Sequence, residues 1–160
     1  MKTHGWKGML YPIVILMALT RAFSQSSSVC IEDLTSSEVR DKIRAGMTIA
    51  IIYVGSTEQN GSHLALGKHN FISHYVGVQI ALELGNALVY PILPFAPAGD
   101  PESKTGHMRY PGTVSLSADV FGGVVRDVAV SAIAAGFGFV MVMGDHGGGQ
   151  DVLKETAASL

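Results

Sequence analysis

The sequence is poor in cysteine and in charged residues, and these shortages exclude several classes of protein. Cys30 is the only cysteine among the 160 residues, so no disulfide can form within one chain. Charged residues make up 15% of the chain and the net charge is −2, which gives no basic surface for nucleic acid. Hydrophobic residues make up 48%, enough for a chain of this length to bury the core of one globular domain.

Several motifs of catalysis and nucleotide binding are also absent. No Gly-x-Ser-x-Gly motif follows an expected strand, so the sequence does not indicate the serine nucleophile of an α/β-hydrolase. No Gly-x-Gly-x-x-Gly motif follows a strand either, and residues 144–149 lack the lysine of a phosphate-binding loop. No internal repeat or low-complexity tract is present. The polar residues that remain as candidates are histidines and carboxylates in loops.

The first 24 residues have the pattern of a secretory signal peptide. Lys2 and Lys7 precede an apolar run at 9–20, which has the length of a signal core and is short for a membrane span. Small residues then match a cleavage site before Gln25. We therefore expect an exported protein, periplasmic or secreted, that has no membrane association after cleavage. An uncleaved anchor or an apolar N-terminal helix is the alternative.

Short apolar runs alternate with helical patterns along the rest of the chain. A linker and N-terminal helix at 25–45 lead to expected strands at 48–54, 87–93 and 137–143, and to helices at 72–84, 117–135 and 150–160. Two of the strand runs are wholly apolar, which favours buried strands covered on both faces. This order predicts an α/β protein, a three-layer α/β/α sandwich with a mostly parallel sheet over residues 46–160. The sheet is thin and no stop signal follows the last helix, so we expect a domain incomplete at its C-terminus.

Two polar loops follow two of the expected strands. Residues 55–70 contain Glu58, Asn60, His63 and His69, and residues 144–149 read Gly-Asp-His-Gly-Gly-Gly. Because the carboxyl ends of parallel strands meet at one edge of a sheet, we expect the two loops to lie together. Carboxylates and imidazoles are ligands of divalent metals such as zinc, and a metal with an open position activates water. The pattern therefore predicts a metal site.

The glycines at 147–149 leave bare amides beside His146, and these could face an anion or a developing oxyanion. Each residue also has a simpler interpretation. Histidines and glutamates are common on surfaces, and Asp145 could be only the cap of the following helix. A long irregular loop at 95–113 contains His107, which is either part of a lid or without a role.

Three segments resemble the creatininase (creatinine amidohydrolase) family. GSTEQNGSHLALGKHN at 55–70 is similar to a family loop that usually reads GSTEQHGPHLPL and is followed by an aspartate. YPGTVSL at 110–116 is similar to an FPGT-type segment, and GDHGGG at 144–149 to an NGHGGN loop. The order and spacing also agree with the family. The resemblance implies an α/β/α sandwich, often oligomeric, that uses zinc or manganese to hydrolyse cyclic or linear amide C–N bonds.

Carried over by position, the resemblance implies that Glu58 and His146 ligate a metal. Asn60 stands where the family has a ligating histidine, and His69 stands where it has an aspartate that bridges two metals. Gly148 stands where creatininase itself has a further ligating glutamate. We therefore expect a site for one metal ion and not for two. Its ligands would be Glu58, His69 and His146, with Asn60 as a candidate additional ligand.

The sequence thus predicts an exported metal-dependent hydrolase that acts on a small-molecule amide. It does not decide between a monomer and a homo-oligomer. Asp145 is the expected catalytic base, or else it orients a ligand histidine. Gly147 and Gly148 are expected to face the substrate. The departures at 60 and 69 motivate the alternative, a non-catalytic binding or structural module that kept the fold.

Overall fold

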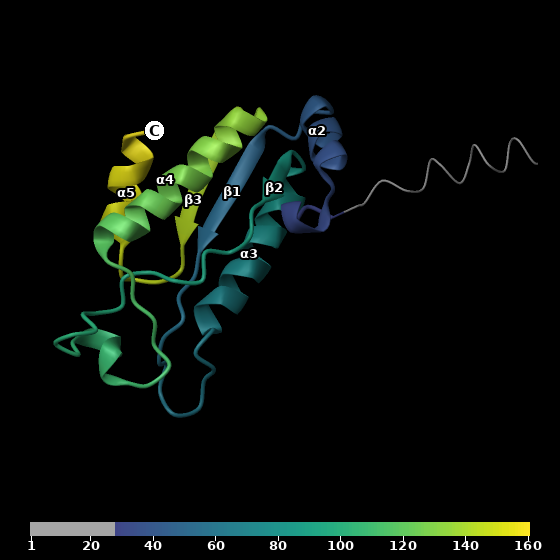
Figure 1. The fold of residues 1–160 in the computed structure, drawn as a ribbon. Coiled ribbons are helices and arrows are strands. Elements are labelled where there is room, and N and C mark those ends of the chain that lie inside the picture. The colour runs from purple at the N-terminus through teal and green to yellow at the C-terminus, as the bar shows by residue number, and fades with distance from the viewer. Residues whose placement is uncertain (1–27) are drawn as a thin grey trace, which may run out of the picture.

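A small parallel sheet forms the centre of the molecule. The computed structural model describes residues 28–160, and the expected signal segment at 1–24 lies outside them. The strands are β1 (Ile49–Val54), β2 (Ala87–Val89) and β3 (Phe139–Gly144), all parallel, in the order β2-β1-β3. Their carboxyl ends point toward the same end of the molecule, where the connecting loops gather (Figure 1). The predicted α/β class with a parallel sheet is confirmed.

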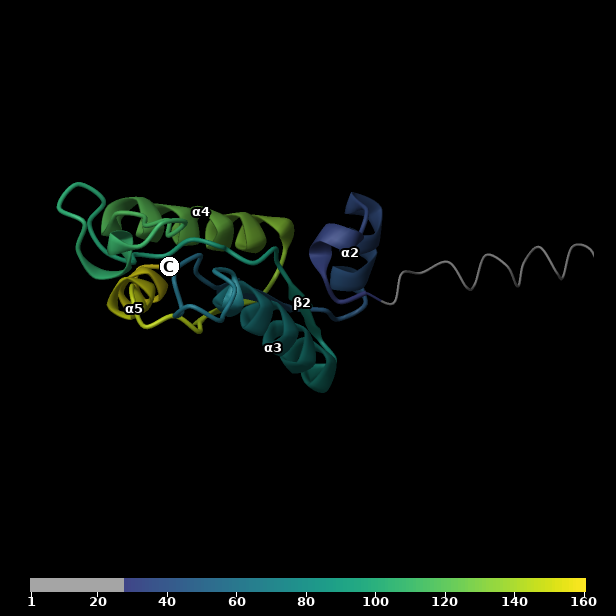
Figure 2. The same cartoon turned by 90° about the horizontal axis from the view of Figure 1, so that it is seen from below.

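Helices cover both faces of this sheet. They are α2 (Ser36–Arg44), α3 (Lys68–Leu84), α4 (Ala118–Ala135) and α5 (Gln150–Ala158), with short 3-10 turns η2 (Ile31–Asp33) and η3 (Gly106–Arg109). Figure 2 shows α4 and α3 on opposite sides. The packing agrees, since Ala50 of β1 lies in a cluster with α2 and α4 whereas Ile51 lies in one with α3. The last helix, α5, packs against α4 and β3.

Strand β1 is the central strand and is buried from Ala50 to Val54. Its successive side chains point to opposite faces, and both faces meet helices, so every position is apolar. The absence of alternation in its sequence predicted this environment.

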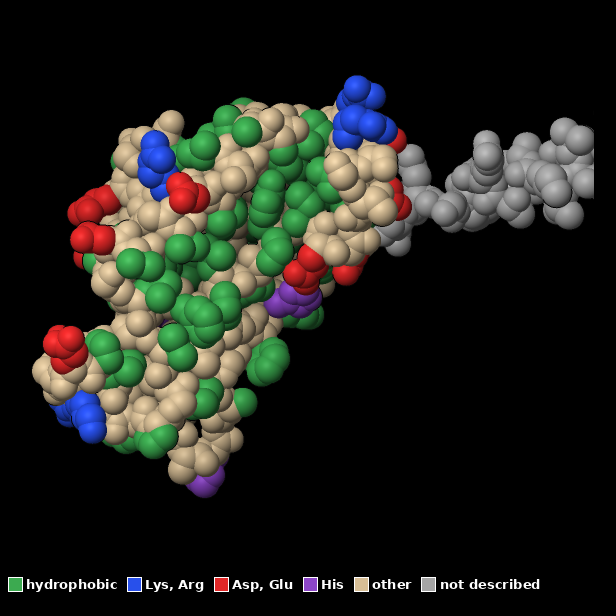
Figure 3. All heavy atoms as spheres, viewed as in Figure 1, with side chains coloured by type: hydrophobic (Ala, Val, Ile, Leu, Met, Phe, Trp, Pro, Cys, Tyr) green, Lys and Arg blue, Asp and Glu red, His purple; other side chains and the backbone are tan. Residues whose placement is uncertain are grey.

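Apolar side chains also gather on the surface between α4 and α2, with the charged residues around the rim (Figure 3).

The two outer strands differ from expectation. β3 was expected to be buried, yet it lies at an edge of the sheet and Phe139 is 70% exposed. β2 ends at Val89, earlier than expected, because Pro91 lacks the N–H that would continue the ladder. Pairing resumes as a bridge between Val54 and Leu93. On the outer side of β2, the Val89 amide donates to the carbonyl of Val29 at 2.8 Å, so that edge is covered.

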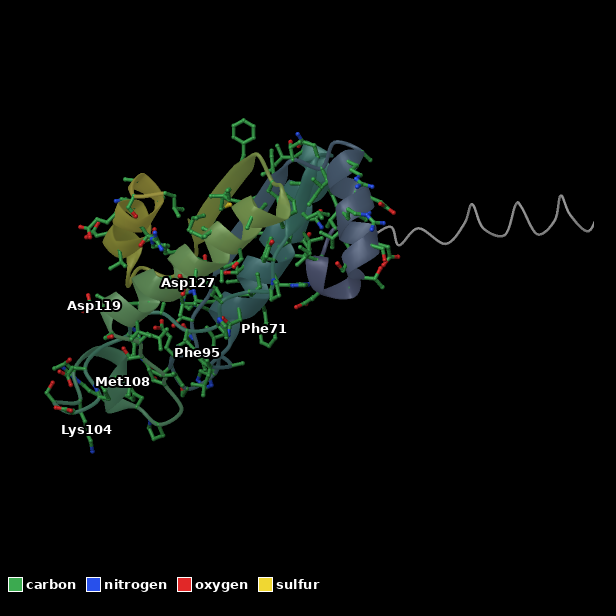
Figure 4. All side chains as sticks on the ribbon, turned by 45° about the horizontal axis from the view of Figure 1, so that its top comes forward. Phe71, Phe95, Lys104, Met108, Asp119 and Asp127 are labelled. Carbon is green, nitrogen blue, oxygen red and sulfur yellow. The ribbon has the colours of Figure 1, made fainter. Side chains whose placement is uncertain are left out.

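Helix α3 begins at Lys68, four residues before the expected start, and this places His69 in its first turn. The long loop keeps its irregular form but contains η3, which carries His107. Phe71, Phe95 and Met108, from α3 and this loop, lie toward the loop end of the molecule (Figure 4). Among the described helices, none combines the length and the apolar composition needed to cross a bilayer.

Candidate metal-binding site

A buried carboxylate occupies the carboxyl end of the sheet. Glu58 lies in the loop after β1 and is 2% exposed. Its backbone amide donates to the carbonyl of Leu66 at 3.0 Å, which fixes the turn. The hydroxyl of Ser56, itself fully buried, donates to Glu58 Oε2 at 3.3 Å. A carboxylate removed from water in this way needs a cation or several donors beside it.

Three imidazoles from different parts of the chain point their Nε2 atoms at this carboxylate. His146, in the loop after β3, has Nε2 at 2.7 Å from Glu58 Oε2. His69, on the first turn of α3, has Nε2 at 3.3 Å from Oε1, and His107 of η3 has Nε2 at 3.9 Å from the same oxygen. The side chains of His69 and His146 are 12% and 8% exposed, whereas that of His107 is 39% exposed. The carboxylate is therefore surrounded by imidazole nitrogens.

The second nitrogen of each ring, Nδ1, points away from Glu58 and lies beside a hydrogen-bond acceptor. His69 Nδ1 lies 2.6 Å from Asp145 Oδ2, and His146 Nδ1 lies 3.2 Å from the carbonyl oxygen of Gly148. His107 Nδ1 lies 3.2 Å from the carbonyl oxygen of Gln59 and 3.1 Å from Gln59 Nε2. A proton on Nδ1 satisfies the outer acceptor and leaves the Nε2 lone pair facing inward. Metal-ligating histidines have this arrangement in most proteins.

The electrostatics favour the neutral form of His146. Burial lowers the pKa of its imidazole below the ordinary value, although the Glu58 carboxylate acts in the opposite direction. Coulombic repulsion from the neighbouring His69 and His107 rings lowers the pKa of His146 further. A neutral imidazole is the form that binds a metal.

The donor set suits a divalent metal. Glu58, His107 and His146 each offer one ligand atom, and the three atoms lie within 4.8 Å of one another. Imidazole nitrogen and carboxylate oxygen are ligands of zinc and also of manganese. Two or three side chains with an open position are the arrangement of a catalytic site, in contrast to a closed structural one. The residues present therefore fit a single divalent ion.

The structure brings together most of the residues chosen from the sequence. Glu58, His69 and His146 are neighbours, as the metal-ligand prediction requires, and Asp145 adjoins them through His69. Asp145 reaches the ring of His69 and holds it, which matches the orienting role. Asn60 uses its amide nitrogen to donate to the backbone carbonyl of Glu58 at 2.9 Å, and this bond braces the turn.

The two glycines expected to face the substrate have different surroundings. Gly147 is exposed, and a Cβ at this position would meet nothing within 4 Å. A Cβ on Gly148 would overlap the carbonyl oxygen of Pro97 and the ring of His146. Gly148 is therefore required by the close approach of the long loop, and only Gly147 lies against open space.

Sequence reasoning did not assign His107 to the site, and it treated His63 as an available donor although His63 is exposed. His107 lies beside Glu58 because the segment that follows it is hydrogen-bonded to the loop after β1. The backbone amide of Gln59 donates to Thr113 Oγ1 at 3.2 Å, and the amide of Val114 donates to the carbonyl of Thr57 at 2.9 Å. The position of His107 three residues before the YPGT segment was the available signal.

Comparison with known proteins places these features in a family. A family profile described as creatinine amidohydrolase matches residues 32–160. Creatinine amidohydrolase of Pseudomonas putida is 29% identical over 121 residues, which are 76% of this chain and 46% of that protein. A creatininase crystal structure matches with a TM-score of 0.75 at 27% identity, over 84% of this chain and 51% of that one.

A mutant creatininase of Zn-Zn type matches with a TM-score of 0.74, also at 27% identity and over 84% and 51% of the two chains. A manganese form and a mutant complexed with creatine match at 26% identity. The chain thus spans about half the length of the relatives it matches.

Proposed function

Because the chain belongs to the creatininase family, we propose that it acts in the metal-dependent hydrolysis of an amide C–N bond in a small molecule. The observation that carries this proposal is the buried Glu58 carboxylate, toward which imidazole nitrogens converge from the first turn of α3, from η3 in the long loop and from the loop after β3. Such an arrangement has no evident purpose in the stability of the fold, since a buried carboxylate costs free energy unless a cation compensates it.

Glu58 and His146 would hold the metal, with further imidazole ligation from the neighbouring rings. When bound, a divalent metal polarises an amide carbonyl and lowers the pKa of a coordinated water. Asp145 accepts the Nδ1 proton of His69 at 2.6 Å and keeps that ring in one orientation. Gly147 offers the open backbone beside the site, where a substrate can approach closely.

A cyclic amide related to creatinine is the first substrate to test. The reason is that one matching structure is a creatininase complexed with creatine, the ring-opened form of creatinine. Zinc and manganese are the metals to supply, because matching structures hold each of them.

The experiment is an amide-hydrolysis assay of the chain loaded with zinc or with manganese. Creatinine, other five-membered cyclic amides and linear amides form the panel. We expect turnover that depends on the metal and disappears in Glu58→Gln, while Glu83→Gln, an exposed carboxylate on α3, leaves it unchanged. A chain that binds metal but hydrolyses none of the panel would instead be the non-catalytic module, which the departures from the family pattern at positions 60 and 69 favour.

Export belongs to the same proposal. Its support is the pattern of residues 1–24, a basic start followed by a short apolar run and small residues. Expression of the full chain in a host with a secretory pathway, followed by N-terminal sequencing, tests it. We expect a mature protein that begins at Gln25, and an intact N-terminus retained inside the cell would contradict export.

A further inference from the structure

We propose that His107 is a ligand of the metal, and that the single bound ion fastens the long loop at 95–113 to the carboxyl ends of β1 and β3. This inference takes the metal from the proposed function but does not depend on hydrolysis. It concerns a residue at which the quoted family motifs assign no ligand. Three separate features of the structure support it.

The first feature is distance. The ligand atoms of Glu58, His107 and His146 lie within 4.8 Å of one another. Ligands at 2.0–2.1 Å from a tetrahedral zinc ion lie about 3.3 Å apart. His146 Nε2 is already closer than this to Glu58, at 2.7 Å, and His107 Nε2 is farther, at 3.9 Å. The Nε2 atom of His107 therefore needs to move by less than about 1 Å to reach this separation, and its side chain is 39% exposed.

The second feature is the orientation of the ring. His107 Nδ1 lies 3.2 Å from the backbone carbonyl oxygen of Gln59. With the proton on Nδ1, this carbonyl is the acceptor and Nε2 presents its lone pair to Glu58. The side chain of Gln59 lies 3.1 Å from the same nitrogen and can donate to it in the other tautomer. Metal binding at Nε2 would select the first tautomer, because the lone pair must be free.

The third feature is the way the loop is attached. Its ends are held by Thr57, whose hydroxyl donates to the carbonyl of Pro94 at 2.9 Å and whose carbonyl accepts from Val114. Residues 99–106 between these ends are exposed. His107 joins this part of the loop to the site, and its own amide donates to the carbonyl of Ala98 at 2.8 Å. An ion bound by His107 therefore adds a further attachment between the two ends, beside the Nδ1 contact with the Gln59 carbonyl.

The same loop explains why one ion is expected and not two. Position 148 is where the resemblance places a further ligating glutamate, and here a Cβ would overlap the carbonyl oxygen of Pro97 and the His146 ring. Position 60, where it places a ligating histidine, is an asparagine whose amide braces the backbone of Glu58. The long loop thus fills the space that a ligand side chain at position 148 would need, while it contributes His107 to the first ion.

The test measures binding and loop protection without any substrate. The full chain is titrated with zinc by calorimetry, and hydrogen exchange of residues 98–113 is followed by mass spectrometry with and without the ion. We expect one zinc per chain and slower exchange in the loop when zinc is present. In His107→Ala, zinc affinity should fall about 10-fold to 100-fold and the loop protection should vanish. His74→Ala, an exposed histidine on α3, is the matched control and should change neither result.

A second variant gives a direct reading of ligation. In His107→Cys, a thiolate within reach of a bound cobalt ion adds a sulfur-to-metal charge-transfer band, which the parent chain with its Cys30 should lack. Absence of this band, or unchanged affinity and loop protection in His107→Ala, would overturn the inference. Binding of two zinc ions per chain would overturn its single-ion part. One zinc with a protected loop but no amide hydrolysis would support the inference while it refutes the proposed function.

Discussion

The two histidines that flank Glu58 on its Oε1 side reach it by different routes. His69 stands on the first turn of α3, and an acidic side chain, Asp145, holds its outer nitrogen. His107 stands on a short turn in an irregular loop, and a backbone carbonyl holds its outer nitrogen. The helix gives His69 a fixed position that is 12% exposed, whereas the loop leaves His107 partly open at 39%. One imidazole is therefore positioned before metal binds, and the other gains its final position from the metal.

Loss of the carboxylate that both histidines share should have the largest effect. Glu58→Gln removes the negative charge and one strong ligand, so zinc affinity should fall by about 100-fold or more, and hydrolysis should stop. Calorimetric titration and the amide assay measure the two results. Glu83→Gln is the control, and equal losses in both variants would mean that the buried position of Glu58 has no special role.

Disruption of the contact between the long loop and the backbone after β3 should have the second largest effect. Gly148→Ala forces a methyl group against Pro97 and His146, so we expect a loss of about 1 to 3 kcal/mol in the free energy of unfolding and weaker zinc binding. Gly147→Ala is the matched control, because a Cβ there meets nothing within 4 Å. Chemical denaturation compares the two variants. Equal stability of both would show that the loop does not press on position 148.

Removal of the acidic partner of His69 should have an intermediate effect. Asp145→Asn keeps an oxygen that accepts the Nδ1 proton but loses its charge, so metal affinity should fall roughly 10-fold. Asp145→Glu should recover part of this loss. The cobalt spectrum should keep its band positions, because the metal ligands remain the same. Large changes in that spectrum would place Asp145 on the metal itself.

Removal of the side chain beside His107, the counterpart of Asp145 beside His69, should have the smallest effect on zinc affinity. Gln59→Ala removes the amide side chain but leaves the backbone carbonyl that accepts from Nδ1, so zinc affinity should change by less than about 10-fold. The same titration measures it. If Gln59→Ala weakened binding as much as His107→Ala, the side chain and not the carbonyl would be what orients this ring.

The sequence was sufficient for the parts of the site that lie next to strands. Glu58 and His146 follow β1 and β3, and parallel strands bring their carboxyl ends together whatever the loops do. His69 was chosen as a loop residue, and its place on α3 became visible only in the structure because no strong cap marks the start of that helix. His107 depends on hydrogen bonds between residues 57–59 and 113–114, which no local pattern encodes.

The order of the strands in the sheet could not be predicted from local sequence patterns either. An apolar run predicts a strand, but it does not tell whether a neighbour lies on each side. β1 and β3 have similar sequences, yet β1 is central and Phe139 of β3 is 70% exposed. Strand order is a property of the whole fold, so it could not be read from either run alone.

The side chain of Gln150 connects the last helix to the metal site. It opens α5 and donates two hydrogen bonds, to the carbonyl of Gly144 at 3.1 Å and to the carbonyl of His146 at 2.7 Å. Detachment of α5 would release the backbone that aims the His146 ring and would lower the affinity for the ion. Thermodynamic linkage requires the reverse as well, so an ion bound near Glu58 should hold α5 against α4 and reduce its fraying.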